Sequence, residues 1–483
     1  MLLGLDLGTG SVKALLISED GAVLGEASAT YAVGSPKPGW AETAPEEWWE
    51  AVAAAVREAT GSRGAEVASL GLSGQMHGVV LSDVSGVPLR PAVLWADTRS
   101  REQLAAYRDL GAELRRKLAN PPAAGMAGPS LLWLRDHEPE ACEAARWALQ
   151  PKDWLRLRLT GEVAAEPSDA SATLLYDLEA GGWSDEISGA IGLRTDWLAP
   201  LVDSDAVAGA LTREAAEHLG LPEGLPVAAG AADTAASILG AGLPGPGTLQ
   251  LTVGTGGQIV GLKEDPVPDP GQRIHLYRTA WEEQGSYYSM AAIQNAGLAL
   301  EWARKVLGAS WDVVYREAFD VPPGSDRLLF LPYLSGERTP HFDPDARGAW
   351  AGLGLDHGRG HLLRAALEGV AFALREGLEA LETAGISAPE LRLAGGGAIE
   401  EPWRQLLADV LQRPLRLLPD SVAASASARG AAILAGLASG AYGAGDVQKL
   451  APEVQRIIRP GEDGGSYEVP YSRFRELYPR LYG

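Results

Sequence analysis

The chain has 483 residues, of which 46% are hydrophobic and 22% are charged, a composition that excludes extended disorder and has room for two large domains. Its 41 Lys and Arg residues against 63 Asp and Glu residues give a net charge of -22, which disfavours nucleic acid and anionic membranes as partners. The single cysteine, Cys142, excludes an internal disulfide, and because we find no signal-peptide pattern and no apolar stretch of about 18 residues, we expect a cytoplasmic protein without a membrane span.

The beginning of the sequence predicts a β-hairpin. Apolar runs of strand length cover residues 2–7 and 12–17, and the bend between them, residues 8–11, reads Gly-Thr-Gly-Ser. A third strand is expected over residues 22–27, after an Asp-Gly turn.

A helix and a fourth strand should follow. Thr43 and Glu46 have the three-residue spacing of a capping box, and apolar residues recur at helical spacing over residues 49–56. Residues 67–72 then predict a strand. The middle of the chain is less informative, because apolar pieces such as residues 154–159 do not settle the order of helices and strands.

The second half of the sequence repeats the opening pattern. Residues 248–253 alternate polar with apolar, Gly-Thr-Gly-Gly at 254–257 makes a bend, and residues 258–262 continue as a strand. The two bends are about 245 residues apart, which is the best signal of an internal repeat. Four glycines and two prolines within residues 239–247 suit a crossing between lobes. We therefore predict two domains, residues 1–245 and 246–483.

Helices and strands continue to alternate towards the end. We expect a helix from about residue 361 to 384, a strand over residues 391–394 that enters three consecutive glycines, and an alanine-rich helix over residues 427–438. This order of elements indicates an α/β fold.

The two Gly-Thr-Gly bends are candidate phosphate sites. Glycine lets the main chain approach an anion closely, and two bends facing each other would hold a polyphosphate from both sides. The alternative is that each bend merely closes a hairpin. No glycine precedes a lysine directly, and Lys13 stands where a dinucleotide fingerprint needs its third glycine, so a P-loop or Rossmann site is not expected.

Two aspartates stand at strand ends. Asp6 has apolar neighbours, so its carboxylate needs backbone donors from the bend or a hydrated divalent cation. Asp233 follows a strand that ends in glycine and precedes a helix start, a place for a plain helix N-cap and also for a general base. These readings do not exclude each other.

His77 and Trp95 are candidate ligand contacts. His77 is flanked by glycines just after a strand, which raises the expectation of ligand contact above that for an isolated histidine. Trp95 with Asp97 and Arg99 could form a polar rim for a sugar, and the alternative is a core tryptophan beside a surface ion pair.

Taken together, these segments resemble the FGGY carbohydrate kinases over nearly the whole chain. The segments that carry the resemblance are residues 6–9 with Lys13, 74–78, 151–158, 254–257, 331–341, 352–353, 361–368, 395–398 and 403–405. The resemblance implies two actin-like, ribonuclease H-like ATPase lobes with the active site in the cleft between them. It implies an N-terminal lobe with the sugar site and the first phosphate motif, and a C-terminal lobe with the second phosphate motif and the adenosine motif.

The resemblance also implies roles for individual residues. Asp233 would be the catalytic base and a sugar ligand, Asp6 would support catalysis through the magnesium of MgATP, Met76 and His77 would contact the sugar, and Thr9, Gly10, Ser11, Lys13, Thr255, Gly256, Gly297, Gly396 and Gly397 would bind the nucleotide. The expected cofactors are ATP and Mg²⁺, and the expected partners are a small sugar and ATP, without nucleic acid or membrane and with a homodimer left open.

The activity implied is ATP-dependent phosphorylation of a sugar hydroxyl, with O5 of D-xylulose as the first expectation. Ala96 and Thr234 stand where relatives commonly have asparagine, which keeps another ketose or polyol, such as ribulose, ribitol or glycerol, as an alternative. Ser130 stands where the family's N-terminal signature usually has lysine, and nothing in the sequence explains this difference. A nucleotide-dependent sensor on the same lobes is a further alternative from another class, although such proteins usually carry an extra binding domain.

Overall fold

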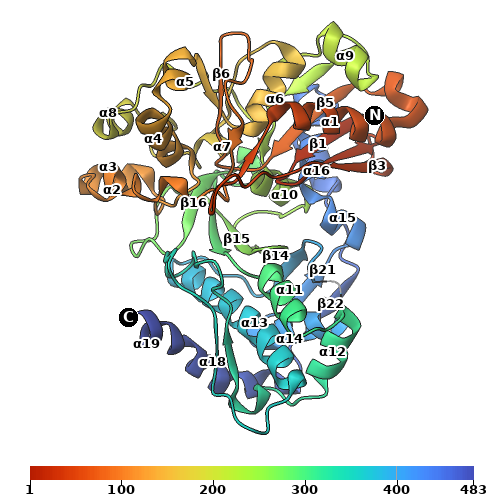
Figure 1. Ribbon diagram of the computed structural model, residues 1–483. Coiled ribbons are helices and arrows are strands. Elements are labelled where there is room, and N and C mark those ends of the chain that lie inside the picture. The colour runs from red at the N-terminus through yellow and green to blue at the C-terminus, as the bar shows by residue number, and fades with distance from the viewer. Residues whose placement is uncertain (399) are drawn as a thin grey trace.

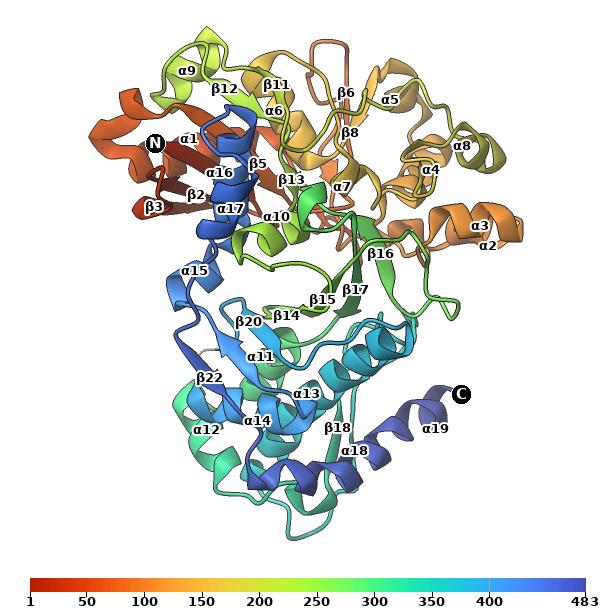
Figure 2. The ribbon, with the colours of Figure 1, turned by 180° about the vertical axis from the view of Figure 1, so that it is seen from behind.

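The computed structural model describes residues 1–398 and 400–483, with Asp463 described by its backbone alone. Two mixed sheets form the centres of two lobes, one above the other in Figure 1 and again in the view from behind in Figure 2. This is the α/β architecture that the alternating pattern predicts. No helix within the described part of the chain has both the length and the apolarity needed to span a membrane.

The N-terminal sheet begins with the predicted hairpin. Its strands run in the spatial order β11 (Val207–Ala210), β12 (Pro226–Ala228), β5 (Ser69–Gly74), β1 (Leu2–Leu7), β2 (Ser11–Ile17) and β3 (Val23–Thr30), and β13 (Ala231–Ala232) also pairs with β5. Strand β1 is antiparallel to β2 and parallel to β5. The parallel pair brings the carboxyl ends of β1, β5 and β13 to one edge, where ligands bind in open α/β sheets.

Helices cover both faces of this sheet. Because side chains alternate along a strand, Leu3, Leu5 and Leu7 pack with α1 (Pro45–Thr60), whereas Leu2 packs with α16 (Ala426–Ala438) on the other face. The α16 backbone lies directly on the strands: a Cβ atom on Gly4 or on Gly71 would come within 1.9 Å of an α16 carbonyl oxygen. In Figure 1, α16 is the blue helix among the red strands of the upper lobe.

Helix α1 begins differently from the sequence prediction. The N-cap is Ala44, which has no side chain that could cap the helix, and Pro45 occupies the first turn. The hydroxyl of Thr43 instead donates to the carbonyl of Ala32. The predicted capping box is therefore wrong, because proline fixes the backbone angle that starts the helix and needs no cap for a missing N–H group.

The residues between β5 and β11 form a layer of short elements beside the N-terminal sheet. They include β6 (Val80–Ser82) paired with β8 (Trp147–Leu149), together with the helices α4 (Ala127–His137), α6 (Pro151–Thr160), α7 (Pro167–Ala170) and α8 (Asp185–Ile191); α9 (Arg213–Leu219) follows β11. Apolar side chains of this layer form a core of their own around Tyr107, Leu131 and Trp197.

The C-terminal sheet repeats the hairpin device. Its spatial order is β16 (His275–Arg278), β17 (Tyr287–Ile293), β15 (Gly257–Lys263), β14 (Leu249–Val253), β20 (Leu391–Ala394), β21 (Leu415–Leu417) and β22 (Arg456–Ile458). The strands β14, β15 and β20 are found where the sequence predicts them. The predicted helix at 361–384 is α13 (Arg359–Thr383), whose apolar side packs on this sheet beside α11 (Gly297–Val306), α12 (Trp311–Phe319) and α14 (Glu401–Leu411).

Strand β16 and helix α16 both make contacts that join the lobes. Strand β16 reaches the N-terminal lobe, where Asn120 bonds to both the carbonyl and the N–H group of Leu276, at 2.7 and 2.9 Å. Helix α16 returns from the C-terminal half of the sequence to the N-terminal sheet and also packs on α10 (Asp233–Gly240). The domain boundary near residue 245 stays a prediction. Helix α16 follows this boundary in the sequence but packs on the sheet that precedes it.

Candidate active site

The two Gly-Thr-Gly bends open onto one cleft between the lobes. The cleft encloses about 960 Å³ including its open mouth, within the size range of ligand sites. Asp6 and Asp233 line it from the N-terminal lobe, and Thr255 and Gly256 line it from the C-terminal lobe. Four residues that the sequence assigns to catalysis or phosphate binding are therefore brought together.

The first bend follows directly from β1. Gly8 donates its N–H to the carbonyl of Ser11 at 3.0 Å, which closes the bend, and Gln75 donates to the carbonyl of Gly8 at 3.0 Å. The hydroxyl of Thr9 accepts a hydrogen bond of 2.8 Å from the indole nitrogen of Trp95. The bend is thus fixed to the segment that carries Trp95.

The second bend is fixed to the start of α11. Gly254 donates to Gly256 at 2.9 Å, and its carbonyl accepts from the N–H of Gly297 at 2.9 Å. A Cβ atom on Gly297 would lie 2.5 Å from that carbonyl oxygen, so only glycine allows the helix to approach the bend this closely. Gly397 lies beside the same strand end, with its N–H 2.9 Å from the carbonyl of Val253.

Asp233 is the first residue of α10, at the carboxyl edge of the N-terminal sheet. One carboxylate oxygen accepts from the N–H and the hydroxyl of Thr234, at 2.5 and 3.1 Å, and no hydrogen bond to the other oxygen is found among the described residues. Burial, followed by the charge of Asp6, raises the pKa of Asp233 to about 7. A carboxyl group with this pKa is partly deprotonated at neutral pH, and its carboxylate is a stronger base than that of an ordinary aspartate, which suits a general base.

Asp6 lies across β5 from Asp233. In the register, Asp6 pairs with Ser73, which pairs with Ala231 on the far side, so two strand spacings of about 4.8 Å separate these backbones. Burial raises the pKa of Asp6, although the hydroxyl of Ser73 donates to its carboxylate at 3.0 Å and Lys13 opposes the shift.

The residues present fit a magnesium ion that arrives with the nucleotide. Within the described residues, no cluster of three or more acidic, histidine or cysteine side chains could hold a metal by itself. Asp6 offers a single carboxylate beside a phosphate bend, and Mg²⁺ characteristically binds one or two carboxylates together with phosphates and water.

Met76 and His77 come directly after β5. Met76 is buried, with its sulfur 3.9 Å from the hydroxyl of Tyr288. The Nδ1 atom of His77 lies 2.9 Å from the carbonyl of Ala172, so Nδ1 carries a proton and Nε2 is left as an acceptor. Burial, aided by the charge of Arg338, lowers the pKa of His77 to about 3, which keeps the ring neutral.

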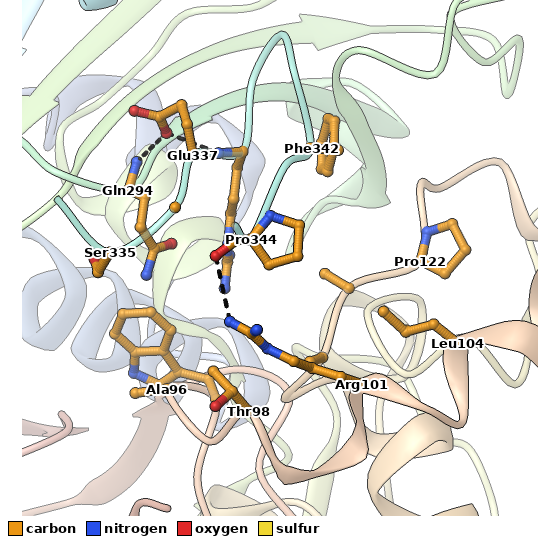
Figure 3. Close-up of a pocket in the computed structure, with 15 residues that line it drawn as sticks. Ala96, Thr98, Arg101, Leu104, Pro122, Gln294, Ser335, Glu337, Phe342 and Pro344 are labelled. Atoms are coloured by element: carbon orange, nitrogen blue, oxygen red, sulfur yellow. Dashed lines mark hydrogen bonds between the residues drawn. The ribbon is translucent and has the colours of Figure 1, made fainter. Parts of the chain in front are cut away.

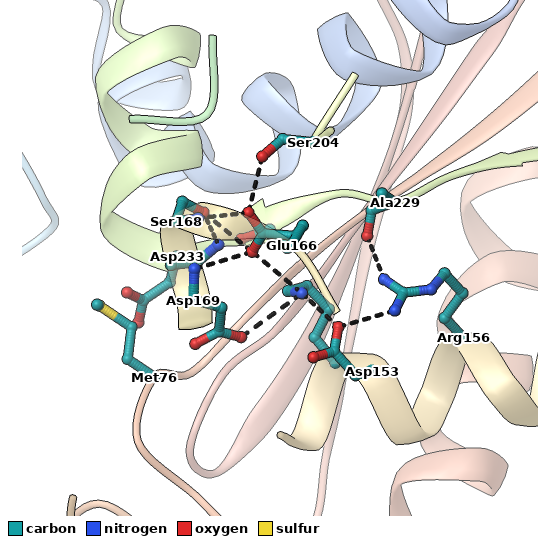
Figure 4. Close-up of polar contacts among 12 residues, drawn as sticks. Met76, Asp153, Arg156, Glu166, Ser168, Asp169, Ser204, Ala229 and Asp233 are labelled. Carbon is teal, nitrogen blue, oxygen red and sulfur yellow. Dashed lines mark hydrogen bonds and ion pairs between the residues drawn. The ribbon is translucent and has the colours of Figure 1, made fainter. Parts of the chain in front are cut away.

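A buried group of charges, the Lys152 cluster, lies beside Asp233 (Figure 4). It consists of Lys152, Asp153, Arg156, Glu166 and Asp169, each at most 2% exposed. The ammonium nitrogen of Lys152 lies 2.6, 3.2 and 3.6 Å from the carboxylates of Asp153, Glu166 and Asp169. Burial raises the pKa of Asp169 well above its usual value.

The Lys152 cluster is connected to the start of α10 by hydrogen bonds. Glu166 accepts from the N–H and the hydroxyl of Ser168, at 2.7 and 3.0 Å. The Ser168 hydroxyl oxygen in turn accepts from the N–H of Ala232 at 3.0 Å. Because Ala232 directly precedes Asp233, the cluster fixes the backbone from which the Asp233 carboxylate extends (Figure 4).

Of the other predicted site residues, Lys13 is bound to the protein itself. The ammonium group of Lys13 donates to the carbonyl of Ala424 at 2.7 Å and pairs with Glu26 at 3.2 Å. Gly10 and Ser11 belong to the first bend and to the start of β2, and a Cβ atom on Gly10 or on Gly396 would meet no neighbour within 4 Å. Their assignment to the nucleotide stays a prediction.

Among the other residues that line the cleft are Trp95, Gln258 and Arg338. The sequence pointed to Trp95 as part of a polar rim with Asp97 and Arg99. In the structure only Trp95 of these three lines the cleft, because Asp97 and Arg99 form a buried ion pair of 2.7 Å with each other. Arg338 belongs to residues 331–341, whose pattern carries the family resemblance without pointing to a role. For Gln258 the sequence offered no signal.

Comparisons with known proteins agree along the whole chain. The model of the N-terminal domain of the FGGY family of carbohydrate kinases matches residues 1–240, and that of its C-terminal domain matches residues 249–439. The xylulose kinase of Escherichia coli K12 is 35% identical, over 100% of this chain and 99% of that protein.

Solved structures give the same result. A xyloylose kinase from Brucella ovis has a TM-score of 0.90 and 36% identity, covering 100% of this chain and 99% of its own. The gluconate kinase of Lactobacillus acidophilus has a TM-score of 0.92 and 25% identity, covering 99% of this chain and 97% of its own.

Proposed function

This chain belongs to the FGGY family of carbohydrate kinases, and we propose that its acceptor is D-xylulose, phosphorylated at O5 with Asp233 as the general base. It is a sugar kinase that uses ATP as the phosphate donor. The proposal for xylulose is supported by the xylulose kinase of Escherichia coli, which is similar along the full length. The observation that carries the catalytic assignment is the half-buried Asp233 side chain, whose carboxyl pKa is raised to about 7, in the cleft that both bends share.

The proposed reaction is an in-line displacement at the γ-phosphorus of ATP. As the acceptor oxygen forms its bond to phosphorus, its proton passes to the free carboxylate oxygen of Asp233 and the bond to the β-phosphate oxygen breaks, which releases ADP. Thr234 holds the other carboxylate oxygen of Asp233, so the free oxygen is the one available to the acceptor.

The two bends would hold the phosphates. Their backbone N–H groups and the hydroxyl of Thr255 are donors without charge, and in a cleft with little water such donors stabilise the charge that spreads over the transferred group. Asp6 would hold the magnesium ion of MgATP, and the ion supplies positive charge that offsets the negative charge of the phosphates. Closing of the lobes would keep water away from the γ-phosphate.

Met76 and His77 would bind the acceptor. The neutral His77 ring presents Nε2 as an acceptor for a sugar hydroxyl, because its Nδ1 proton is taken by the carbonyl of Ala172. The buried Met76 offers an apolar surface to the C–H face of the sugar.

A second candidate acceptor is another polyol or sugar acid. This alternative is favoured by the likeness to a gluconate kinase over nearly the whole chain and by the small, exposed side chain of Ala96 beside the cleft. Asparagine at this position would offer an amide to the sugar, whereas alanine leaves space.

An assay of ADP release with D-xylulose, D-ribulose, ribitol, glycerol and gluconate tests the proposal. We expect the largest kcat/KM with D-xylulose, and phosphorus NMR of the product should place the phosphate on C5. A larger kcat/KM with gluconate would select the second candidate, and no turnover with any of the five compounds would contradict the proposed function.

A further inference from the structure

One arginine lies where two cavities meet. Arg338 lines the catalytic cleft and also a neighbouring cavity of about 610 Å³ including its mouth, the side cavity. The side cavity lies between residues 95–104 and 122–124 of the N-terminal lobe and residues 335–344 of the C-terminal lobe (Figure 3). Among the described residues, only Trp95 and Gln294 share with Arg338 a place on the walls of both cavities.

The guanidinium group of Arg338 lacks a hydrogen-bond or ion-pair partner among the described residues. No ion pair or side-chain hydrogen bond to it is found within residues 1–398 and 400–483. The adjacent Glu337 carboxylate is taken by the backbone N–H groups of Gln294 and Arg338, at 2.6 and 2.7 Å. Arg101, in the same side cavity, is instead paired with Asp345 at 3.0 Å. It also donates to the carbonyl of Pro344 (Figure 3). The donors of Arg338 are therefore available to a ligand.

The backbone around Arg338 is held in place. Thr339 donates its N–H to the carbonyl of Ala292 at 2.9 Å, and its hydroxyl oxygen accepts from the N–H of Ala292 at 3.0 Å. The guanidinium carbon lies 5.4 Å from the centre of the Trp95 ring, within the range of a cation–π contact. A group fixed in this way loses little conformational freedom when it binds a ligand.

The position of Arg338 points to the acceptor rather than to the nucleotide. Gly8 and residues 254–257 of the two phosphate bends line the cleft but not the side cavity. Arg338 instead lies towards Trp95 and His77, and its positive charge contributes to lowering the pKa of both His77 and the buried His275. An acceptor that reaches from Asp233 towards the side cavity would pass this guanidinium group.

Building on the proposed function, we propose that Arg338 is an acceptor-binding residue that donates hydrogen bonds to the oxygen atoms of the sugar remote from the hydroxyl that receives the phosphate. Arg338 comes from the C-terminal lobe, whereas His77 and Asp233 come from the N-terminal lobe. The sugar is then held by both lobes, and its binding favours their closure. The side cavity gives room to acceptors longer than a pentulose.

Steady-state kinetics of Arg338→Met and Arg338→Lys test this role. Loss of hydrogen bonds from a charged donor should raise KM for the sugar by roughly 10- to 100-fold, with KM for ATP within about twofold of wild type. Lysine should restore part of the affinity, because it keeps the charge but not the forked donors. The matched control is Arg347→Met, an exposed arginine in the same segment that lines neither cavity, and it should behave like wild type.

A second readout is sugar binding in the absence of ATP, measured through the contribution of Trp95 to the change in tryptophan fluorescence. Arg338→Met should weaken this binding by the same factor. If the wild type turns over sugar but Arg338→Met and Arg338→Lys leave KM for the sugar within about twofold, the role of Arg338 is refuted and the proposed function stands. A rise in KM for ATP alone also refutes it. A wild type inactive with every acceptor overturns both proposals, and if Arg338→Met does not fold, Arg338→Lys decides.

Discussion

The two faces of the catalytic cleft carry different kinds of polar group. The N-terminal face presents the carboxyl groups of Asp6 and Asp233, whose pKa values are raised by burial. The Lys152 cluster is connected through Ser168 to the backbone just before Asp233. The C-terminal face presents a backbone bend, amide side chains and the cation of Arg338, and none of its described residues that line the cleft is acidic.

This difference separates chemistry from binding. Both carboxyl groups belong to one lobe, so they keep their mutual geometry when the lobes move. The opposite lobe offers donors and positive charge, which suit phosphates and sugar oxygens. Changes to the two carboxyl groups should therefore lower kcat, changes to the Lys152 cluster should lower stability, and changes on the C-terminal face should raise KM.

The largest effect is expected from Asp233→Asn. Asparagine keeps an oxygen that accepts from Thr234 but cannot take a proton, so kcat should fall by about 10²- to 10⁴-fold while KM for ATP changes little. Steady-state kinetics with D-xylulose measure both constants. A kcat within tenfold of wild type would contradict the assignment of the general base to the N-terminal face.

The thermal stability of Asp233→Asn gives an independent check on the raised pKa of Asp233. The folded-state pKa of Asp233 is raised to about 7 from the usual 3.8, so the native state binds this proton more tightly than the unfolded state does. The contribution of Asp233 to stability is therefore present below pH 3.8 and is lost as the pH rises through about 7. Asparagine avoids this loss, and the Tm of Asp233→Asn relative to wild type should increase from pH 5 to pH 8.

Lys152→Met should give the next largest effect. The variant leaves buried carboxylates without their central cation, which typically costs about 3–5 kcal/mol of unfolding free energy. Urea unfolding measures this loss. Lys305→Met is the matched control, because Lys305 is an exposed partner of Glu301 and such pairs contribute about 0–1 kcal/mol. A loss below about 1 kcal/mol for Lys152→Met would show that the cluster does not support the N-terminal face.

The smallest effect is expected from Gly297→Ala on the C-terminal face. A Cβ atom at this position would lie 2.5 Å from the carbonyl oxygen of Gly254 and would displace the second bend. We expect KM for ATP to rise by roughly tenfold with kcat within about threefold. Gly445→Ala, whose Cβ atom would meet nothing within 4 Å, is the control. A fall in kcat alone would contradict the division between the two faces.

The hairpins and the strand-end aspartates could be predicted because local pattern determines them. Apolar runs separated by Gly-Thr-Gly predict β1, β2, β14 and β15, and they are found there. Asp233 before an apolar helical segment predicts the start of α10. What the local pattern did not contain is the distance across the cleft, because it depends on how the two sheets that carry the bends pack against each other.

The Lys152 cluster could not be predicted from the sequence. Its charged residues follow one another in residues 151–169 as they would on a solvated helix, and no periodicity distinguishes a buried ion pair from an exposed one. The availability of Arg338 to a ligand could not be predicted either, because the adjacent Glu337 suggests an ion pair between the two side chains. Only the fold reveals that backbone N–H groups take that carboxylate.

The pH dependence of kcat/KM for D-xylulose at saturating ATP tests the role of Asp233 most directly. Because the base must be deprotonated, kcat/KM should be constant above an inflection near pH 7 and fall about tenfold for each pH unit below it. A profile without an inflection between pH 5 and pH 8 would contradict the account, since the proton of the acceptor would then go to another group.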